Sequence, residues 1–253
     1  MRWEEVEGIG DLFRADPVYS FWVLLILGSH EMGHYLACRF YGIPATLPFF
    51  VPGVPPIGTF GAVIRIRGPI PHRRALFDVA AAGPLAGFAV ALPVFVVGLL
   101  QARPVEAPVG DQVLGQPVLS ILLTGWLLPD GVAALEVGSP FLAGWVGMLV
   151  TSLNLFPVGQ LDGGHLMYAI SRHSHRIASR VTLVALLCVV VVQIWMFLVP
   201  AYLVWFLILL WMRDRHPRLA DESEPLGGGR LALAWVLLLI FVASFIPMPL
   251  RVG

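Results

Sequence analysis

Long apolar segments alternate with short polar segments along most of the chain. The apolar segments lie at about 18–41, 75–101, 140–171, 181–197, 199–212 and 231–246. Most of them approach the roughly 20 residues that a helix needs to cross a bilayer. The stretch Val181–Trp211 contains Pro200, and we interpret it as two short spans joined by a tight turn. The pattern predicts an all-α polytopic membrane protein with about six transmembrane helices.

The segment after the first span has a different pattern. Residues 42–71 are rich in proline and glycine, which argues against a regular helix. Towards the end of this segment, Val63 and Arg65 alternate with Ile64 and Ile66, which is the period of a β-strand. Backbone outside a helix is tolerated at membrane depth only against protein or water. We therefore expect a membrane-re-entrant β-hairpin or strand between the first two spans.

The spans form two membrane regions behind a short tail. Residues 1–17 are acidic and predict an interfacial N-terminal tail. Residues 18–171 form a first membrane region, and residues 172–253 form a C-terminal one. Small residues in the second span, among them Gly83 and Gly87, favour close packing against a neighbouring helix.

The composition agrees with a lipid bilayer as the surroundings. Hydrophobic residues make up 58% of the chain and charged residues 13%, with a mean hydropathy of +0.82. A soluble domain has about 45–50% apolar and about 25% charged residues. The formal net charge is zero, so we expect no nucleic-acid partner. The two cysteines, Cys38 and Cys188, lie in apolar runs and do not indicate a disulfide framework.

The arginines predict which way the chain faces. If the spans alternate and residues 42–74 lie in the cytoplasm, twelve of the 16 basic residues fall on the cytoplasmic side. Cytoplasmic segments of membrane proteins carry an excess of basic residues. This orientation is therefore favoured.

The first span contains a candidate metal motif. His30, Glu31 and His34 match the pattern H-E-x-x-H. On a helix, positions i and i+4 share one face, so both imidazoles can reach one zinc ion while the glutamate serves as a general base. Charged side chains in the middle of a span cost at least about 2.5–3.5 kcal/mol each, and a metal compensates that cost. A wet interfacial helix is the plain alternative.

A catalytic zinc site has three protein ligands, so a third ligand is needed from another span. Asp162 lies 9 residues before Ser171, and His30 lies 11 residues before Tyr41. Both span ends fall on the predicted cytoplasmic side. Counting residues thus places Asp162 at the depth of the two histidines. An aspartate that caps a broken helix is the alternative.

Together these residues resemble a known family. The H-E-x-x-H of His30–His34 and the sequence Asn154-Leu-Phe-Pro-Val-Gly-Gln-Leu-Asp162-Gly resemble the two motifs of the site-2 protease family of intramembrane zinc metalloproteases. The similarity covers about residues 18–171, which would then be the catalytic membrane core. The chain resembles the compact branch of that family, without a PDZ domain.

The resemblance implies a function and a set of site residues. His30, His34 and Asp162 would bind one catalytic Zn²⁺, Glu31 would activate water, and Asn154 would help to hold the substrate or the oxyanion. The substrate would be a transmembrane protein, cleaved within or next to its membrane segment. The expected location is a bacterial inner membrane, with the site toward the cytoplasm. An extended substrate would pair with the strand at Thr59–Ile66.

Other interpretations remain at this stage. A metal transporter or sensor could line its path with the same ligands, and a non-catalytic relative could serve as a scaffold. His165 fits either a partner of a ligand or a packed histidine. His173 and His175 are predicted to lie on a solvated basic face, and Asp78 near Arg73 and Arg74 at a helix start. The sequence does not fix the oligomeric state.

Overall fold

The computed structural model describes residues 16–52, 59–105, 112–127, 134–196, 200–212, 219, 221, 223–247 and 250–252. Helices dominate this part of the chain, as predicted. Their bounds are α2 Pro17–Phe40, α3 Arg73–Leu100, α4 Val118–Leu127, α5 Ser139–Asn154, α6 Asp162–Ile170, α7 Arg172–Trp195, α8 Leu203–Met212 and α9 Gly228–Ser244. The strands are β1 Phe49–Pro52, β2 Thr59–Val63, β3 Arg103–Val105, β4 Gln112–Leu114, β5 Ala134–Glu136 and β6 Leu250–Val252.

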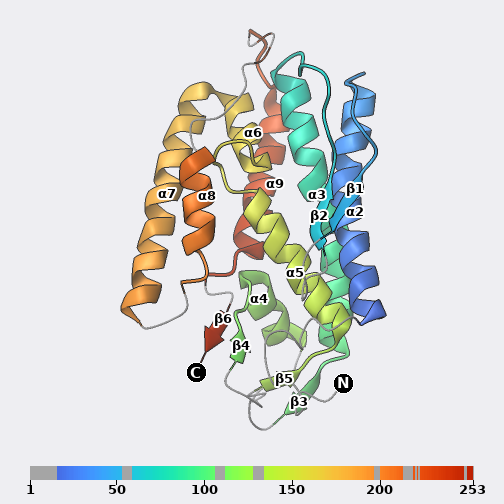
Figure 1. The fold of residues 1–253 in the computed structure, drawn as a ribbon, viewed down its shortest axis with the longest axis vertical. Helices are drawn as coiled ribbons and strands as arrows, with labels where there is room; N and C mark the ends of the chain where they lie inside the picture. The colour runs from blue at the N-terminus through green and yellow to red at the C-terminus, as the bar shows by residue number, and fades with distance from the viewer. Residues whose placement is uncertain are drawn as a thin grey trace.

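The helices form a bundle whose long axis is vertical in Figure 1. Helices α2 and α3 lie side by side, and α5 crosses the middle of the bundle. Helices α7 and α8 lie on the opposite side from α2 and α3, with α6 and α9 in between. Helix α4 and the short strand pairs β3–β5 and β4–β6 occupy the lower end. These two strand pairs were not predicted. The bundle brings α2, α3 and α6 together, which is where the candidate residues lie.

Small residues allow the first two long helices to approach each other closely. Helix α2 begins at Pro17, where the Asp16 carboxylate accepts a hydrogen bond from the backbone N–H of Val18. Farther along α2, Gly33 faces α3, and a Cβ at this position would overlap the backbone of Ala82 and lie 3.0 Å from the side chain of Ala86. The close packing predicted for α3 is therefore present against α2.

The start of α2 is also joined to α5 by a polar contact. The Ser139 hydroxyl at the start of α5 donates to the Asp16 carboxylate, and this hydrogen bond lowers the pKa of Asp16. One carboxylate therefore caps α2 and joins it to α5.

A β-hairpin follows α2, in the segment where strand was expected. Strands β1 and β2 are antiparallel, and Phe49 pairs with Val63 while Phe50 pairs with Ala62. Beyond β2, the backbone N–H of Arg65 donates to the Thr46 hydroxyl. The hairpin lies along α2 in Figure 1. Its entry into a membrane is not tested by the structure and stays a prediction.

The third predicted span is divided in two. Helix α5 ends at Asn154, and α6 begins at Asp162, with Pro157 and Gly159 in the segment between them. Proline lacks a backbone N–H and Gly159 has a φ of +58°, so this segment does not continue the helix. The break lets the chain turn and places Asp162 in the first turn of a new helix.

The number of spans remains a prediction. Within the described residues, two helices, α3 and α7, are long and apolar enough by themselves to cross a membrane. Helix α7 starts nine residues before the predicted span at 181, directly after α6, whereas α8 has 10 residues and reaches only about 15 Å. Most of the predicted tail at residues 1–17 lies outside the described residues.

Helix ends that border the predicted cytoplasmic segments meet at one end of the bundle. The end of α2 and the starts of α3, α7 and α9 all lie at the top of Figure 1. There Arg230 of α9 donates two hydrogen bonds to the Asp78 carboxylate of α3, at 2.8 and 2.7 Å. The Tyr41 hydroxyl also donates to Asp78. Asp78 thus lies near the start of α3, where it was expected, and it also joins α3 to α9 and to Tyr41 at the end of α2.

We predict that Asp78 and Arg230 are energetically coupled. Asp78→Asn and Arg230→Gln should each lower the stability, and the double variant should lose less than the sum. Because both side chains are about 30% exposed or less, we expect a coupling of about 1 kcal/mol from a double-mutant cycle on unfolding in mixed micelles. The more exposed pair Arg74 and Glu224 should give a smaller coupling. Additive effects at Asp78 and Arg230 would refute the prediction.

Candidate metal centre

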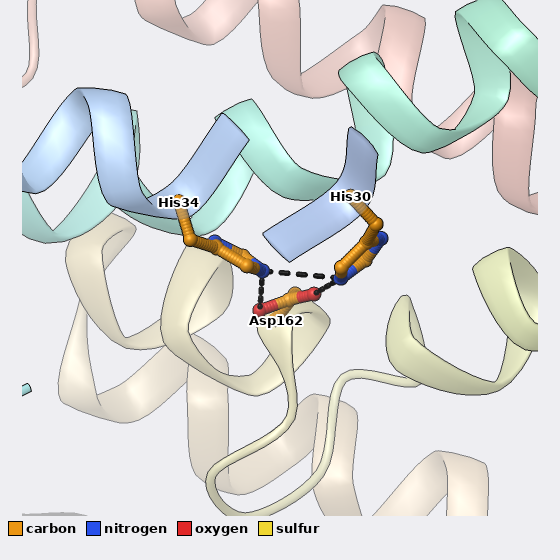
Figure 2. A group of neighbouring side chains, drawn as sticks. All are labelled: His30, His34 and Asp162. Carbon is orange, nitrogen blue, oxygen red and sulfur yellow. Dashed lines mark hydrogen bonds and ion pairs between the residues drawn. The ribbon is translucent and has the colours of Figure 1, made fainter. Parts of the chain in front are cut away.

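The three predicted ligand residues meet in the interior of the bundle. Figure 2 shows His30 and His34 extending from α2 toward Asp162 at the start of α6. The Nε2 atoms of the two histidines lie 3.1 Å apart. His30 Nε2 is 3.3 Å from Asp162 Oδ2, and His34 Nε2 is 3.4 Å from Asp162 Oδ1. Each carboxylate oxygen thus faces one imidazole.

These separations fit a metal ion. Ligand atoms on a tetrahedral zinc ion, with bonds of about 2.0–2.1 Å, lie about 3.3 Å from each other. The three observed distances are close to this value, with the two distances to Asp162 measured to its two different oxygens. One oxygen of Asp162 and the two imidazole nitrogens lie within 4.8 Å of one another. Two imidazole nitrogens and one carboxylate oxygen form a donor set that suits zinc, whereas calcium and magnesium prefer oxygen ligands alone.

Helix α3 orients the second histidine. His34 Nδ1 lies 2.7 Å from the backbone carbonyl oxygen of Val79, so this nitrogen carries the proton and donates it to the carbonyl. The Nε2 atom of His34 then has a free lone pair directed at Asp162. A hydrogen bond from the other ring nitrogen is the usual way in which proteins orient a metal-binding histidine.

Two glycines of α3 make room for the two imidazoles. A Cβ at Gly83 would overlap the ring of His34, and a Cβ at Gly87 would lie 3.0 Å from the Cβ of His30. Gly83 and Gly87 have the same spacing of four residues as the two histidines. Each imidazole therefore lies against a glycine of the neighbouring helix, and both rings are held between α2 and α3.

Glu31 and Asn154 lie beside this cluster. The Glu31 carboxylate accepts a hydrogen bond of 3.0 Å from the backbone N–H of Ile64, which follows β2 directly. Asn154 ends α5, and its side-chain nitrogen lies 3.4 Å from His30 Nε2. Both residues are partly buried. The structure thus brings all five predicted site residues to one place.

The other histidines differ in their surroundings. His165 is partly buried in α6, and its predicted alternatives stay open. His173 is exposed on α7, as predicted, but His175 is only 4% exposed, so its predicted place on a solvated face is wrong. His175 Nε2 donates to the carbonyl oxygen of Gly159. The arginines at 172 and 176 suggested a solvated face, but the side chain at position 175 packs against the segment between α5 and α6.

A helical bundle with an H-E-x-x-H helix facing an aspartate of a broken helix is typical of a membrane-bound metallopeptidase. Comparison with family models supports this class: residues 18–198 match the model of Peptidase family M50. The chain belongs to Peptidase family M50.

Curated relatives point the same way. The chain is 38% identical over 152 residues to "Probable zinc metalloprotease EGY2, chloroplastic" of Arabidopsis thaliana, covering 58% of this chain and 27% of that protein. It is 32% identical over 247 residues to "Probable zinc metalloprotease EGY1, chloroplastic" of Oryza sativa subsp. japonica, covering 92% of this chain and 41% of that protein. The chain thus spans less than half of either relative, and these plant proteins give no support to a bacterial membrane as the location.

We predict that the glycines of α3 control metal binding. Gly83→Ala should displace the His34 ring and weaken Zn²⁺ binding by about 10-fold or more, a loss typical of disturbed ligand orientation. Gly87→Ala should have a smaller effect, because its Cβ would meet the Cβ of His30 at a longer distance. Competition with a chelator measures both affinities.

Gly125→Ala is the matched control. Gly125 is exposed on α4, and a Cβ there would meet nothing within 4 Å. Alanine also favours the helix at all three positions. A loss of Zn²⁺ affinity in the two α3 variants alone would therefore come from displacement of the imidazole rings. Equal Zn²⁺ affinities in Gly83→Ala and Gly125→Ala would contradict the prediction.

Proposed function

We propose that this chain is an intramembrane zinc metalloprotease that hydrolyses peptide bonds within or next to the transmembrane segment of a membrane-protein substrate. The observation that carries the proposal is the convergence of His30, His34 and Asp162 at tetrahedral separations, with Glu31 beside them. Membership of a peptidase family and the names of the relatives support the same activity.

His30, His34 and Asp162 hold the zinc ion in this proposal. The bound metal supplies Lewis acidity, which polarises a carbonyl group and makes water a stronger nucleophile. Glu31 is the general base: its carboxylate accepts a proton from the attacking water and later passes it to the departing amine. The hydrogen bond from Ile64 to one oxygen holds this carboxylate in place, and no other described residue donates to its second oxygen.

Asn154 contributes a hydrogen-bond donor. Its side-chain amide lies at the same level as the ligands, 3.4 Å from His30 Nε2. An amide N–H at this place can stabilise the negative charge that develops on the carbonyl oxygen during attack, or hold the substrate backbone. Because α5 ends at Asn154, the side chain projects from a helix end toward the cluster.

The hairpin supplies a place for an extended substrate. A transmembrane helix hides its carbonyls in hydrogen bonds, so the substrate has to unwind before water can reach the peptide bond. Strand β2 is paired with β1 along one edge. The other side of this segment faces α2, since Ile64 donates there to Glu31. A substrate strand that pairs along this side between Thr59 and Ile66 would lie next to the zinc ligands.

The proposed setting is an integral membrane protein with its site toward the cytoplasm. The end of α2 and the starts of α3, α7 and α9, which adjoin arginine-rich parts of the sequence, lie at one end of the bundle in Figure 1. Helix α2 carries the two histidines and ends there, and α6, which carries Asp162, is followed directly by α7, which starts there. In this proposal residues 18–171 are the catalytic membrane core and residues 172–253 a supporting membrane region. The partners are the lipid bilayer and a transmembrane substrate.

Replacing Glu31 should separate zinc binding from catalysis. Glu31→Gln keeps the size of the side chain and leaves the three ligands unchanged, so bound zinc should remain. Cleavage of a model single-span substrate in proteoliposomes should fall by about 100-fold or more, since general base catalysis contributes 10²–10⁴. Metal analysis and the cleavage rate are measured on the same preparation.

Two further variants complete this experiment. Met32→Leu changes an exposed position inside the same motif and should leave cleavage unchanged. His30→Ala should lose both zinc and activity. A Glu31→Gln variant that cleaves as fast as the unaltered protein would show that the proposed mechanism is wrong.

The backbone N–H of Ile64 should matter for cleavage and not for zinc. Ile64→Pro removes the backbone N–H that donates to Glu31, and we expect cleavage to fall about 10-fold, the loss of one hydrogen bond to a charged group. Ile64→Val keeps the N–H and should cleave normally. Unchanged cleavage in Ile64→Pro would mean that the strand has only a structural role.

A further inference from the structure

The segment that carries Asp162 to the metal centre has carbonyl groups that no helix satisfies. Between α5 and α6, the backbone hydrogen bonds of the described residues leave the carbonyl oxygens of Pro157 and Gly159 without a backbone donor. Buried carbonyls without partners cost about 1–3 kcal/mol each. These two carbonyls therefore need donors from elsewhere if the segment is to keep its shape.

Helix α7 provides both donors. The Ser179 hydroxyl donates to the carbonyl oxygen of Pro157 at 3.0 Å, and His175 Nε2 donates to that of Gly159 at 3.3 Å. His175 and Ser179 are four residues apart and share one helix face. Both are buried, with exposures of 4% and 3%. Two neighbouring buried polar groups of α7 thus meet two alternate carbonyls of the connecting segment.

Apolar contacts hold the same segment against α7. Phe156 and Val158 pack in one cluster with Leu183 and Leu186 of α7. The His175 ring also meets the Tyr168 ring of α6 edge-on, with centroids 5.7 Å apart. The side chains on either side of Pro157 are therefore fixed by packing, and the polar pair sets the position of the backbone between them.

The carbonyl group of Gly159 lies directly against the start of α6. A Cβ at Gly164, in the first turn of α6, would lie 2.5 Å from the carbonyl oxygen of Gly159 and 2.7 Å from that of Val158. The start of α6 thus rests directly on the carbonyl that His175 binds. Asp162 lies two residues before Gly164, so a shift of the Gly159 carbonyl would move the metal-binding carboxylate as well.

We propose that His175 and Ser179 are positioning residues of the metal centre: from α7, they fix the Pro157 and Gly159 carbonyls and thereby place the Asp162 carboxylate opposite His30 and His34. This inference deepens the proposed function and rests on it for its effect on cleavage. Its effect on metal affinity stands independently. Neither side chain touches the ligands, and both act through the backbone of residues 157–159.

Removal of the donor at position 175 tests the proposal. His175→Phe keeps a ring of similar size against Tyr168 but cannot donate to Gly159. We expect Zn²⁺ affinity, measured by chelator competition, to fall about 10- to 100-fold, as for other groups that orient a metal ligand. Ser179→Ala should weaken binding less, and the two effects should not be additive because both act on one segment.

Rescue distinguishes donation from packing. His175→Gln places an amide N–H near the position of the imidazole Nε2, so it should restore Zn²⁺ affinity to within a few-fold of the unaltered protein. His173→Ala, an exposed histidine on the same helix, should leave the affinity unchanged. The kcat for cleavage should follow the metal affinity at low zinc and recover in part at saturating zinc.

Two results would overturn the proposal. One is a His175→Phe variant with normal Zn²⁺ affinity. The other is a His175→Gln variant as weak as His175→Phe, which would show that the ring packs and that its donor is not needed. Because Zn²⁺ affinity is measured without substrate, a protein that binds zinc and cleaves nothing would refute the proposed protease function and still decide the role of His175.

Discussion

The structure depends on one constraint, the placement of two imidazoles and a carboxylate within hydrogen-bond distance of one another inside an apolar bundle. His30 is 4% exposed and His34 8% exposed, and the surrounding helices offer few polar atoms. Such a group is costly to bury unless its members are paired or bind a metal. The rest of the fold can be understood as the means of holding α2 and α6 where these side chains meet.

Small residues set the distances between the helices that do this. Gly33 and Gly83 bring α2 and α3 together, and a Cβ at Gly144 of α5 would overlap Phe95 of α3. A Cβ at Gly147 would lie 2.9 Å from both Ala91 of α3 and Ile26 of α2. Helix α5 therefore rests on both partners, and its end at Asn154 is fixed in depth. The short segment to Asp162 can then reach the histidines.

The residues of the candidate metal site could be predicted from the sequence because their signals are local. The spacing of His30 and His34 fixes a shared helix face, and the distance of each ligand from its span end fixes its depth. A strand was also expected from the alternation at Val63–Ile66, but β2 lies earlier, at Thr59–Val63, so that only Val63 belongs to both. These signals depend on a few neighbouring residues and do not require knowledge of the partner segment.

Contacts between distant segments were not predictable in this way. Asp78 and Arg230 are 152 residues apart, and nothing in their own neighbourhoods links them. His175 was assigned to a solvated face because Arg172 and Arg176 surround it, and the error came from placing the start of α7 at residue 181. With a helix from Arg172, positions 175 and 179 share a face with the apolar Leu183 and Leu186. Helix boundaries decide which side of a segment is buried.

The hydrogen bond between Ile64 and Glu31 links the two parts of the proposed reaction. The same backbone segment that would pair with an unwound substrate also holds the carboxylate of Glu31, the proposed general base. A substrate strand on this edge would therefore be placed by the segment that also places Glu31. The position of the scissile peptide relative to the base would then be fixed by this one segment. Reactions gain most from such fixed mutual geometry. The hairpin and the ligand helix α2 are thus best regarded as one unit, which α3, α5 and α7 hold in position.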